Sequence, residues 1–488
     1  MSGSQSESLF SQAAVEQPPA VAQEPDNGRG RTNGLSLIFW LLEQRLPTLL
    51  AIPTAIALAV TLAFAPNWWL FPLVWLAVPL FGIFLPLMYL IYRSHQHDAG
   101  PAAWEEVLAF RDPKEGARYR GKKIPMEVVY EAYMAERLDF TTSLENVLLR
   151  RNEFFRFCFT WGDVKFYFAE FLRQKLGHSA RADRNEVKPV YDRGNDFYGW
   201  FLGESMVYTC GIFRNEEESL ETAQRRKLET ICHAAQFKPG DRHLDVGCGW
   251  GGLVVHAARE HGTSSYGITL AEEQVAHAQR LASSQGVADR VKVEVRDYRA
   301  LGDQRFDKIT CIEMAEHVGI KNFQRFLLQM RGLLEDDGIF YLQIAGLRRA
   351  WEYEDFVWGL FMAKYVFPGA DASCPLGFVV SQAERAGFEV HRVENCGTHY
   401  AVTIQKWYQN WQANRNAVVE KYGERWFRLW SMFLGWSVLI ASQGSSTVFM
   451  LTMTKNLKND RRTLPLNQSA RMNRRARWIG ERPVATQQ

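Results

Sequence analysis

The sequence predicts an α/β fold with a doubly wound, mostly parallel sheet, and three observations indicate it. Apolar runs of strand length alternate with helical patterns between about residues 240 and 345, a glycine-rich turn follows the first run, and polar residues stand where the runs end. Alternation of this kind implies right-handed crossovers between parallel strands. Ligands of such sheets bind beyond the carboxyl ends of the strands. The site is therefore expected at that edge of the sheet.

The first strand leads directly into the glycine-rich turn. The turn consists of Leu244, Asp245, Val246, Gly247, Cys248, Gly249, Trp250, Gly251 and Gly252. Glycine is needed where a backbone turns sharply or lies close to a ligand, and no lysine follows as it would in a phosphate-binding P-loop. The spacing therefore favours a cofactor that lies across the turn, such as S-adenosylmethionine, on a Rossmann-like sheet. The alternative is a turn with a purely structural role.

The remaining strands and helices of the sheet follow in order. Strands are expected at Ser264–Leu270, Arg290–Val295, Phe306–Ile312 and Ile339–Ile344, with a closing strand at Val448–Thr454, and helices at Glu272–Gln285 and Asn322–Leu334. Four polar residues then fall at or just after strand ends: Asp245, Thr269, Asp297 and Glu316. One cofactor at that edge can contact all four. Many methyltransferases hold the ribose with an acid after the second strand, but here Thr269, Gln274 or a later acid must supply that contact.

Five short motifs occur in an order that is typical of one family. They are Tyr191–Tyr198, Tyr208–Cys210, the glycine-rich turn, Thr269–Gln274 and Glu316–Gly319. Together they resemble the cyclopropane-fatty-acid synthase family of lipid methyltransferases, over roughly residues 187 to 455. Within that family, Tyr365–Cys374 and two apolar segments near the N-terminus are most similar to members that methylate C9 of the unsaturated long-chain base in the sphingolipid glucosylceramide.

The resemblance implies S-adenosyl-L-methionine as the cofactor and indicates which residues contact it. Besides the turn from Leu244 to Gly252, these are Tyr208, Thr209, Thr269, Leu270, Ala271, Glu272, Glu273, Gln274, Arg296 and Asp297.

The resemblance also implies a set of catalytic residues. In bacterial members a bicarbonate ion acts as the base, held by a Cys, a Glu, a His and a Tyr, and Cys210, Glu316 and Tyr400 match three of these positions. The histidine position is Gln343, whose amide can bind an anion but does not titrate near neutral pH. Whether bicarbonate binds here therefore stays open. Ser437 stands where some bacterial members have a cysteine, which disfavours a covalent cysteine mechanism.

These residue types suit methyl transfer to an alkene. Attack of an alkene on a sulfonium methyl leaves a carbocation, which the site must stabilise, keep from water and then deprotonate. Glu316, or an anion that it positions, is expected to organise the base, and the faces of Tyr208 and Tyr400 can stabilise the cation by ~1–2 kcal/mol each. Each residue also has a structural interpretation: Glu316 as a charge at a helix N-terminus, Cys210 as a small buried hydrophobe and Tyr400 as part of the core.

Composition narrows the class of function further. The chain has 488 residues with 57 basic and 54 acidic side chains, so its overall charge gives no reason to expect nucleic-acid binding. Its seven cysteines form no C-x-x-C pair, which is typical of free thiols in a reducing compartment. No metal-ligand spacing is present, and no metal is expected.

The chain is expected to contain five parts. Residues 1–34 form a disordered polar tail, 35–98 a transmembrane hairpin with helices at about 46–65 and 68–92, 99–186 a helical membrane-proximal region, 187–454 the methyltransferase domain and 455–488 a basic tail. Arginines on both sides of the hairpin predict that both its ends face the cytosol. The catalytic domain is therefore expected on the endoplasmic reticulum or a related endomembrane, in contact with the lipid bilayer. The alternative is a buried or re-entrant hairpin that does not span the membrane.

Three further segments are rich in aromatic residues. Asn152–Trp161 is expected either on the bilayer surface or packed on the catalytic domain. Glu354–Lys364 is expected to be an inserted helix that covers the acyl chain, with packing in the core as the alternative, and Trp407–Trp436 is expected to be helical.

The sequence therefore predicts an S-adenosylmethionine-dependent C-methyltransferase that adds a methyl branch at C9 of an unsaturated sphingoid base. The first alternative is cyclopropane formation or methylation on unsaturated phospholipid acyl chains. A second is N-methylation of a phospholipid headgroup, and a third is a membrane-bound protein that binds the cofactor without catalysis.

Overall fold

The computed structural model describes residues 100–171, 194–368 and 372–457, together with 55, 58–59, 88–89 and 91–96. Within these ranges no helix is both long and apolar enough to cross a membrane. The polar tail 1–34, most of the hairpin 35–98 and nearly all of the basic tail 455–488 lie outside the described residues.

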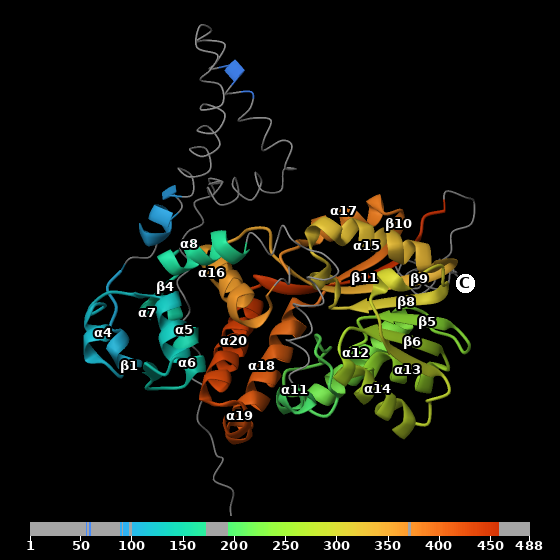
Figure 1. The fold of residues 1–488 in the computed structure, drawn as a ribbon, viewed down its shortest axis with the longest axis horizontal. Coiled ribbons are helices and arrows are strands. Elements are labelled where there is room, and N and C mark those ends of the chain that lie inside the picture. The colour runs from blue at the N-terminus through green and yellow to red at the C-terminus, as the bar shows by residue number, and fades with distance from the viewer. Residues whose placement is uncertain are drawn as a thin grey trace, which may run out of the picture.

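A seven-stranded sheet forms the centre of the catalytic domain (Figure 1). Its strands are β5 (Arg242–Val246), β6 (Ser264–Thr269), β7 (Val291–Val295), β8 (Phe306–Ile312), β9 (Leu334–Leu347), β10 (Phe388–Asn395) and β11 (Ser446–Lys455). Their order across the sheet is β10-β11-β9-β8-β5-β6-β7. Strands β5 to β9 pair in parallel, whereas β11 runs antiparallel to both β9 and β10. The predicted doubly wound, mostly parallel sheet is confirmed.

Helices cover both faces of this sheet. Helices α12 (Leu220–Ala234), α13 (Gly252–His261) and α14 (Glu272–Ser284) lie on one face, and α15 (Ile320–Leu333) and α17 (Leu376–Arg385) on the other (Figure 1). Because both faces are covered, the central strands are buried almost throughout, as β8 is. Polar side chains inside these strands, including Asp245 in β5, are therefore exceptions that need a reason.

Two parts of the sheet differ from the prediction. Strand β9 begins at Leu334, before the predicted Ile339, and β10 was not predicted at all. Strand β10 lies at the edge of the sheet, and only Phe388 in it is buried. An edge strand of this kind lacks the apolar pattern by which a buried strand is found in a sequence.

A layer of long helices stands beside the sheet. The predicted helical stretch Trp407–Trp436 is three helices: α18 (Gly397–Ala413), α19 (Arg415–Tyr422) and α20 (Glu424–Ser442). The last two are separated by Gly423, whose φ of 87° favours glycine. Helix α20 is buried along most of its length, which explains why its sequence is apolar on all sides.

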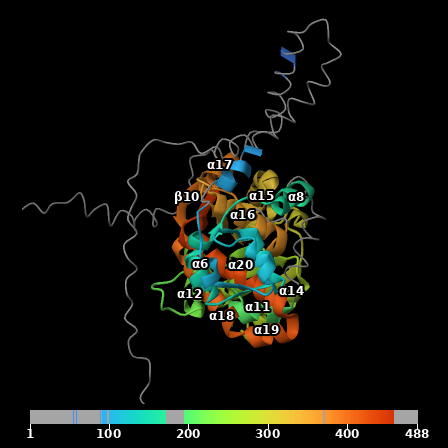
Figure 2. The same ribbon diagram turned by 90° about the vertical axis from the view of Figure 1, so that its left-hand side faces the viewer.

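Residues 100–171 form a smaller region against α20 and α16 (Tyr353–Phe361), as Figure 2 shows. The predicted helical character of this region holds for most of its described residues, and four short strands lie between the helices. Helices α4 (Pro113–Ala117), α5 (Met126–Met134), α6 (Leu144–Leu149), α7 (Arg151–Phe154) and α8 (Trp161–Phe166) alternate with strands β1 (Leu108–Phe110), β2 (Ile124–Pro125), β3 (Leu138–Phe140) and β4 (Phe155–Arg156). These strands are too short for a period of two residues to show in the sequence.

The aromatic segment Asn152–Trp161 packs inside the protein rather than lying open on one face. Phe157 lies 6.0 Å from Trp436 of α20, and Phe159 lies 4.8 Å from Phe356 of α16, measured between ring centroids. Only at its end does a large ring face outward, because Trp161 is 80% exposed. Of the two interpretations that the sequence left open, the structure supports packing on the neighbouring helices.

A buried ion pair joins the same two regions. Arg151 of α7 donates from Nε and Nη2 to the two carboxylate oxygens of Glu354 in α16, at 2.5 and 2.9 Å. Trp436 Nε1 also donates to Glu354, at 3.0 Å, and Arg151 reaches Gln443 Oε1 at 2.7 Å. Helix α16 continues as a π-helical turn, Met362–Val366. Its apolar residues Val357, Leu360 and Phe361 are buried, so this part of the predicted acyl-chain cover is core.

Candidate active site

A pocket opens at the carboxyl ends of β5, β6 and β8, where the sequence predicts the site. Together with the open space at its mouth, it has a volume of about 1160 Å³. Many of the predicted cofactor residues line it: Tyr208, Thr209, Asp245, Val246, Gly247, Cys248, Gly249, Trp250, Gly252, Thr269, Leu270, Gln274, Arg296 and Asp297. The predicted residues Leu244, Gly251, Ala271, Glu272 and Glu273 are not part of its lining.

The glycine-rich turn has two kinds of glycine. Gly247 and Gly251 have φ of 82° and 87°, and a Cβ on either would lie 2.5 Å from Met314 or Ala278 respectively. Their role is close packing. Gly249 has φ of 53°, but a Cβ there would meet nothing within 4 Å, so its backbone lies open beside the pocket. The turn therefore leaves room for a ligand against the backbone just before α13 begins.

Asp245 is held by a chain of hydrogen bonds across three strands. Thr310 of β8 donates its hydroxyl to Asp245 Oδ1 at 2.6 Å, and His243 Nε2 lies 2.8 Å from the same Thr310 oxygen. Because Thr310 has only one proton to donate, Nε2 must carry the histidine proton, and Nδ1 accepts from Ser265 of β6 at 3.0 Å. Burial lowers the pKa of His243 to about 3, so the ring is neutral. Burial also raises the pKa of Asp245 to about 6, although Thr310 opposes this.

The other predicted cofactor residues are positioned by neighbours within the pocket. Thr269 donates to Gln274 Oε1 at 2.6 Å, so the two candidates for the ribose contact lie side by side. Trp250 donates its indole N–H to Asn195 at 2.6 Å, and its ring lies 4.9 Å from that of Tyr198. The first part of the predicted motif, residues 191–193, lies outside the described residues.

The inner wall of the pocket contains a carboxylate that sequence reasoning missed. Glu313 follows β8, lines the pocket, and has φ of 53°, which is unusual for a residue with a side chain. Its Oε1 accepts from the backbone N–H of Cys210 at 2.9 Å and from the Gln343 amide at 2.5 Å. The only signal in the sequence is an acid just after a predicted strand, in the same short loop as Glu316.

Glu316 lies behind this wall. Its Oε1 accepts from the backbone N–H of Ala345, while Oε2 is buried and has no hydrogen-bond partner among the described residues. Burial, and then the negative charge of Glu313, raise the pKa of Glu316 to about 8. The side chain is therefore mostly protonated at neutral pH.

The remaining predicted catalytic residues surround the same wall without lining the pocket. The Cys210 thiol is buried and faces the carbonyl oxygens of Gly211 and Cys396, and burial raises its pKa well above the usual value. Gln343 of β9 is fully buried, and its Oε1 has no partner among the described residues. Tyr400 of α18 is half-buried against the apolar cluster that contains Cys210 and Tyr341. The structure thus brings Cys210, Glu316 and Gln343 together around Glu313, with Tyr400 beside them.

A lysine and an aromatic cluster complete the pocket. Lys227 of α12 is buried, donates to Thr209 Oγ1 at 2.8 Å, and has its pKa lowered to about 8 by burial. Tyr208 lines the pocket, and its ring lies 5.2 Å from Trp407 and 5.3 Å from Phe201. Tyr208 therefore connects the cofactor pocket to the aromatic core between α11 (Asn195–Leu202), α18 and α20.

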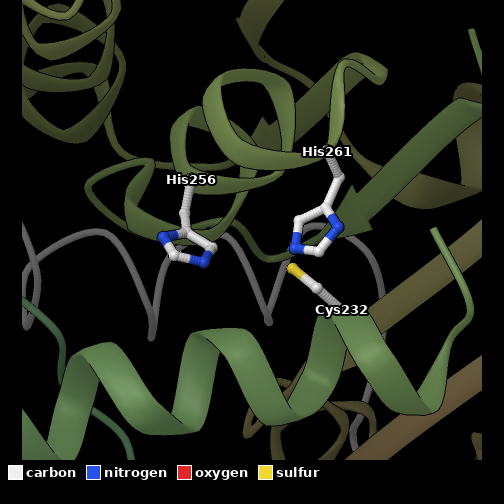
Figure 3. Close-up of side chains that lie close together, drawn as sticks. All are labelled: Cys232, His256 and His261. Carbon is white, nitrogen blue, oxygen red and sulfur yellow. The ribbon is translucent and has the colours of Figure 1, made fainter. Parts of the chain in front are cut away.

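A second cluster of polar side chains lies outside the pocket. Cys232 of α12 approaches His256 and His261 of α13, with one potential ligand atom from each within 4.8 Å of the others (Figure 3). Both histidines lie within hydrogen-bond distance of Glu229 Oε2, at 2.9 and 3.2 Å from Nε2. These hydrogen bonds account for the positions of both rings.

Comparison with known proteins gives consistent matches. The family model described as mycolic acid cyclopropane synthetase matches residues 178–451. Sphingolipid C9-methyltransferase A of Emericella nidulans is 45% identical over 369 residues, which cover 74% of this chain and 71% of the relative. Sphingolipid C9-methyltransferase of Candida albicans is 37% identical over 464 residues, covering 91% of this chain and 88% of the relative.

A solved structure agrees with these matches. Mycolic acid cyclopropane synthase CmaA1, complexed with SAH and CTAB, is 26% identical and superimposes with a TM-score of 0.53. The superposition covers 56% of this chain and 98% of that protein.

Proposed function

Because the chain belongs to the mycolic acid cyclopropane synthetase family and is an S-adenosylmethionine-dependent methyltransferase, we propose that it methylates C9 of the unsaturated long-chain base of a sphingolipid, glucosylceramide. The substrate is suggested by the relatives, several of which are named sphingolipid C9-methyltransferase and match most of this chain. The observation that carries the chemistry is the inner wall of the pocket, where buried carboxyl groups and aromatic rings meet beside the cofactor residues.

The pocket residues fit the cofactor in chemical type. The backbone at Gly249 is open to a ligand, the Asp245 carboxylate is held by Thr310, and the Thr269–Gln274 pair offers polar atoms to a ribose. S-adenosylmethionine supplies an electrophilic methyl group when bound. Tyr208 lies between this pocket and the aromatic core, where its ring can stabilise a cation on the substrate and exclude water.

An ionised carboxyl group in the inner wall supplies negative charge where the cation develops. A carboxylate in a site that excludes water offsets positive charge much more strongly than it does in water. Removal of the proton from the methylated carbon restores the alkene and leaves a methyl branch. Glu316 is proposed to organise this step together with Cys210, Gln343 and Tyr400.

The protein is further proposed to be anchored in an endomembrane by the hairpin 35–98, with the catalytic domain in the cytosol. Two hydrogen bonds indicate which part of the catalytic domain lies next to the hairpin and so would face the membrane. His95 Nε2 lies 2.9 Å from the Phe159 carbonyl, and Ser94 Oγ accepts from the Phe159 N–H at 3.2 Å. The end of the predicted hairpin is thus attached next to exposed Trp161, a residue type that favours membrane interfaces.

Lipid analysis tests the proposed function. The chain is expressed in a host that makes Δ8-unsaturated glucosylceramide without methylating it, and lipids labelled from methionine are analysed by mass spectrometry. Label in the sphingoid base with the double bond kept is the expected result, and Asp245→Ala should abolish it. Label as a ring in phospholipid acyl chains would identify a cyclopropane synthase instead, and label on headgroup amines an N-methyltransferase.

The role of Glu316 is tested separately. Glu316→Gln keeps an acceptor for the Ala345 N–H but has no proton to exchange. It should bind S-adenosylhomocysteine like the wild type and lose most of its turnover, by about 100-fold. Turnover equal to the wild type would contradict the role.

A further inference from the structure

The bicarbonate ion of bacterial family members does not fit the inner wall of this pocket. A free anion needs N–H or O–H donors to replace its hydration. Here the Cys210 N–H and the Gln343 amide both donate to Glu313, and the Ala345 N–H donates to Glu316. Each of these three groups thus already donates to a carboxyl group of the chain itself. An added anion would also lie against the charge of Glu313.

From this arrangement we infer that Glu313 is the catalytic base of this enzyme and that its carboxylate replaces the bicarbonate ion. The inference rests on the proposed function, since it concerns the proton that leaves the methylated lipid. Glu313 lines the pocket that the predicted cofactor residues form. The two donors on Oε1 fix the orientation of the Glu313 carboxyl group, and a general base must be oriented in this way.

The backbone supports the same assignment. Glu313 has φ of 53°, a left-handed conformation that disfavours every residue with a Cβ except in special circumstances. Such conformations persist where the surrounding structure requires them and are common at active sites. Glycine would adopt this turn without strain, so the chain keeps a carboxylate at a position where glycine is the easier residue. The side chain itself is therefore the feature that needs explanation.

The charges divide between the two neighbouring carboxyl groups. Burial raises the pKa of Glu313, but its two hydrogen bonds and the positive charge of Lys227 oppose that rise. Glu316 has no cation that lowers its pKa, and the charge of Glu313 raises it further, to about 8. Two carboxyl groups that repel each other in this way do not both ionise. The two donors on Oε1 and the charge of Lys227 favour Glu313 as the ionised member of the pair, and Glu316 as the neutral one.

Methyl transfer and deprotonation need only the alkene, the sulfonium methyl group and Glu313. The π electrons of the alkene form a bond from C9 to the methyl carbon, and the carbon–sulfur bond breaks with its electron pair left on sulfur. The adjacent carbon becomes a cation. Glu313 takes the proton from C9, the electrons of that C–H bond restore the double bond, and Glu313 becomes a neutral acid. It returns the proton to solvent after the products leave, so no oxidant, reductant or further anion is needed.

The first experiment uses the unmodified chain in membranes that contain Δ8-unsaturated glucosylceramide. Methyl transfer is measured in buffer stripped of carbon dioxide and again after addition of bicarbonate. The expected result is the same rate in both. A rate that falls on depletion and recovers with bicarbonate would overturn the inference. If label from methionine appears in another unsaturated lipid, the proposed substrate is wrong, and the same bicarbonate comparison is made on that lipid.

The second experiment uses two variants of one position. Glu313→Gln should lose at least about 100-fold in turnover while its affinity for S-adenosylhomocysteine stays unchanged. Glu313→Gly, which suits the left-handed backbone, frees the Cys210 and Gln343 donors, and its turnover should recover in part with added bicarbonate. Turnover of Glu313→Gln within threefold of wild type would overturn the inference, and so would a loss of cofactor affinity as large as the loss of turnover. The first outcome shows that the carboxylate is dispensable, and the second shows a structural role.

Discussion

Two buried glutamates, Glu354 and Glu316, show what separates a structural carboxylate from a chemical one. Glu354 joins residues 100–171 to the catalytic domain, and both its oxygens are bound by Arg151, with Trp436 as a third donor. Glu316 lies behind the pocket with one backbone donor, and its second oxygen has no hydrogen-bond partner among the described residues. Both side chains are about 6% exposed, so burial alone does not distinguish them.

The difference lies in the partners. A buried charge is tolerated when a cation and enough donors replace its hydration, and Glu354 has both. Glu316 lacks the cation, so its pKa rises to about 8 and the side chain keeps its proton at neutral pH. Perturbed groups of this kind gather at active sites because they can change protonation state near the working pH. A carboxylate whose oxygens all have hydrogen-bond or cationic partners holds parts of the protein together. A carboxyl group that lacks such partners can take part in proton movement.

Removal of Arg151 from the Arg151–Glu354 ion pair should have the largest effect on stability. Arg151→Met keeps the length of the side chain but leaves Glu354 buried without its partner. The free energy of unfolding should fall by about 3–5 kcal/mol, as is common when one member of a buried ion pair is removed. Thermal unfolding of the full chain, followed by tryptophan fluorescence, measures this change. The double variant Arg151→Met with Glu354→Gln should recover much of the loss.

Because Glu354 has a structural role, Arg151→Met should leave the pocket functional. Arg151→Met should bind S-adenosylhomocysteine with wild-type affinity below its unfolding temperature, because none of its contacts reaches the pocket. A drop in affinity without a drop in stability would show that the ion pair acts on the site, and the distinction between the two glutamates would then fail.

Glu316 should instead make stability depend on pH. Its pKa is about 8 in the folded protein, against an ordinary value of 4.5, so the folded state binds more protons between these two values. The stability that protonation gives is complete below about pH 4.5 and is lost as the pH rises through 8. The loss amounts to at most about 1.4 kcal/mol for each pH unit. Glu316→Gln should remove this slope, so the variant gains on the wild type as the pH rises.

Denaturation curves at pH 5, 6.5 and 8 measure the slope for both proteins. Glu354→Gln serves as the matched control, since it removes the buried carboxylate of the Arg151–Glu354 ion pair. It should be less stable than the wild type throughout this range and should not gain on it toward pH 8. Parallel curves for Glu316→Gln and the wild type would mean that Glu316 is ionised in the folded protein.

The sheet and the pocket could be predicted because local patterns determine them. The alternation of strands and helices fixes the parallel sheet, and the glycine-rich turn marks the strand end where the pocket opens. The hydrogen-bond chain that holds Asp245 could not be predicted in this way. Its members lie on three strands, and they meet because the register pairs His243 with Ser265 and Asp245 with Thr310. That register is known only once the order of the strands is known.

Glu313 could not be predicted for a related reason. Its side chain meets Cys210 and Gln343, which are far away in the sequence, and it does so because its own backbone is left-handed. No periodic pattern signals such a turn at a residue other than glycine or asparagine. The family motif Glu316–Gly319 contains Glu316 but not Glu313, which precedes it by three residues.

The smallest expected effect is a change in unfolding free energy when a glutamate with a left-handed backbone is replaced by glycine. Two glutamates with similar φ, Glu136 and Glu313, allow backbone strain to be separated from a chemical role. Glu136 has φ of 57° just after α5, where glycine commonly ends a helix, and Glu313 has φ of 53° in the pocket. Glu136→Gly should stabilise the chain by about 1 kcal/mol, because the left-handed conformation costs roughly that much with a Cβ and the ion pair with Arg111 at 3.9 Å is exposed. Its turnover should not change.

Glu313→Gly relieves the same strain but leaves the Cys210 N–H and the Gln343 amide without their acceptor. An unpaired buried donor costs about 1–3 kcal/mol, and removal of a buried charge offsets part of that cost. The unfolding free energy should therefore stay within about 1 kcal/mol of the wild type while turnover without bicarbonate is lost. Differential scanning calorimetry of both variants beside the wild type measures the comparison. A loss of several kcal/mol in Glu313→Gly would make Glu313 a structural carboxylate like Glu354, since a strained residue kept for its chemistry should cost the fold little when it is replaced by glycine.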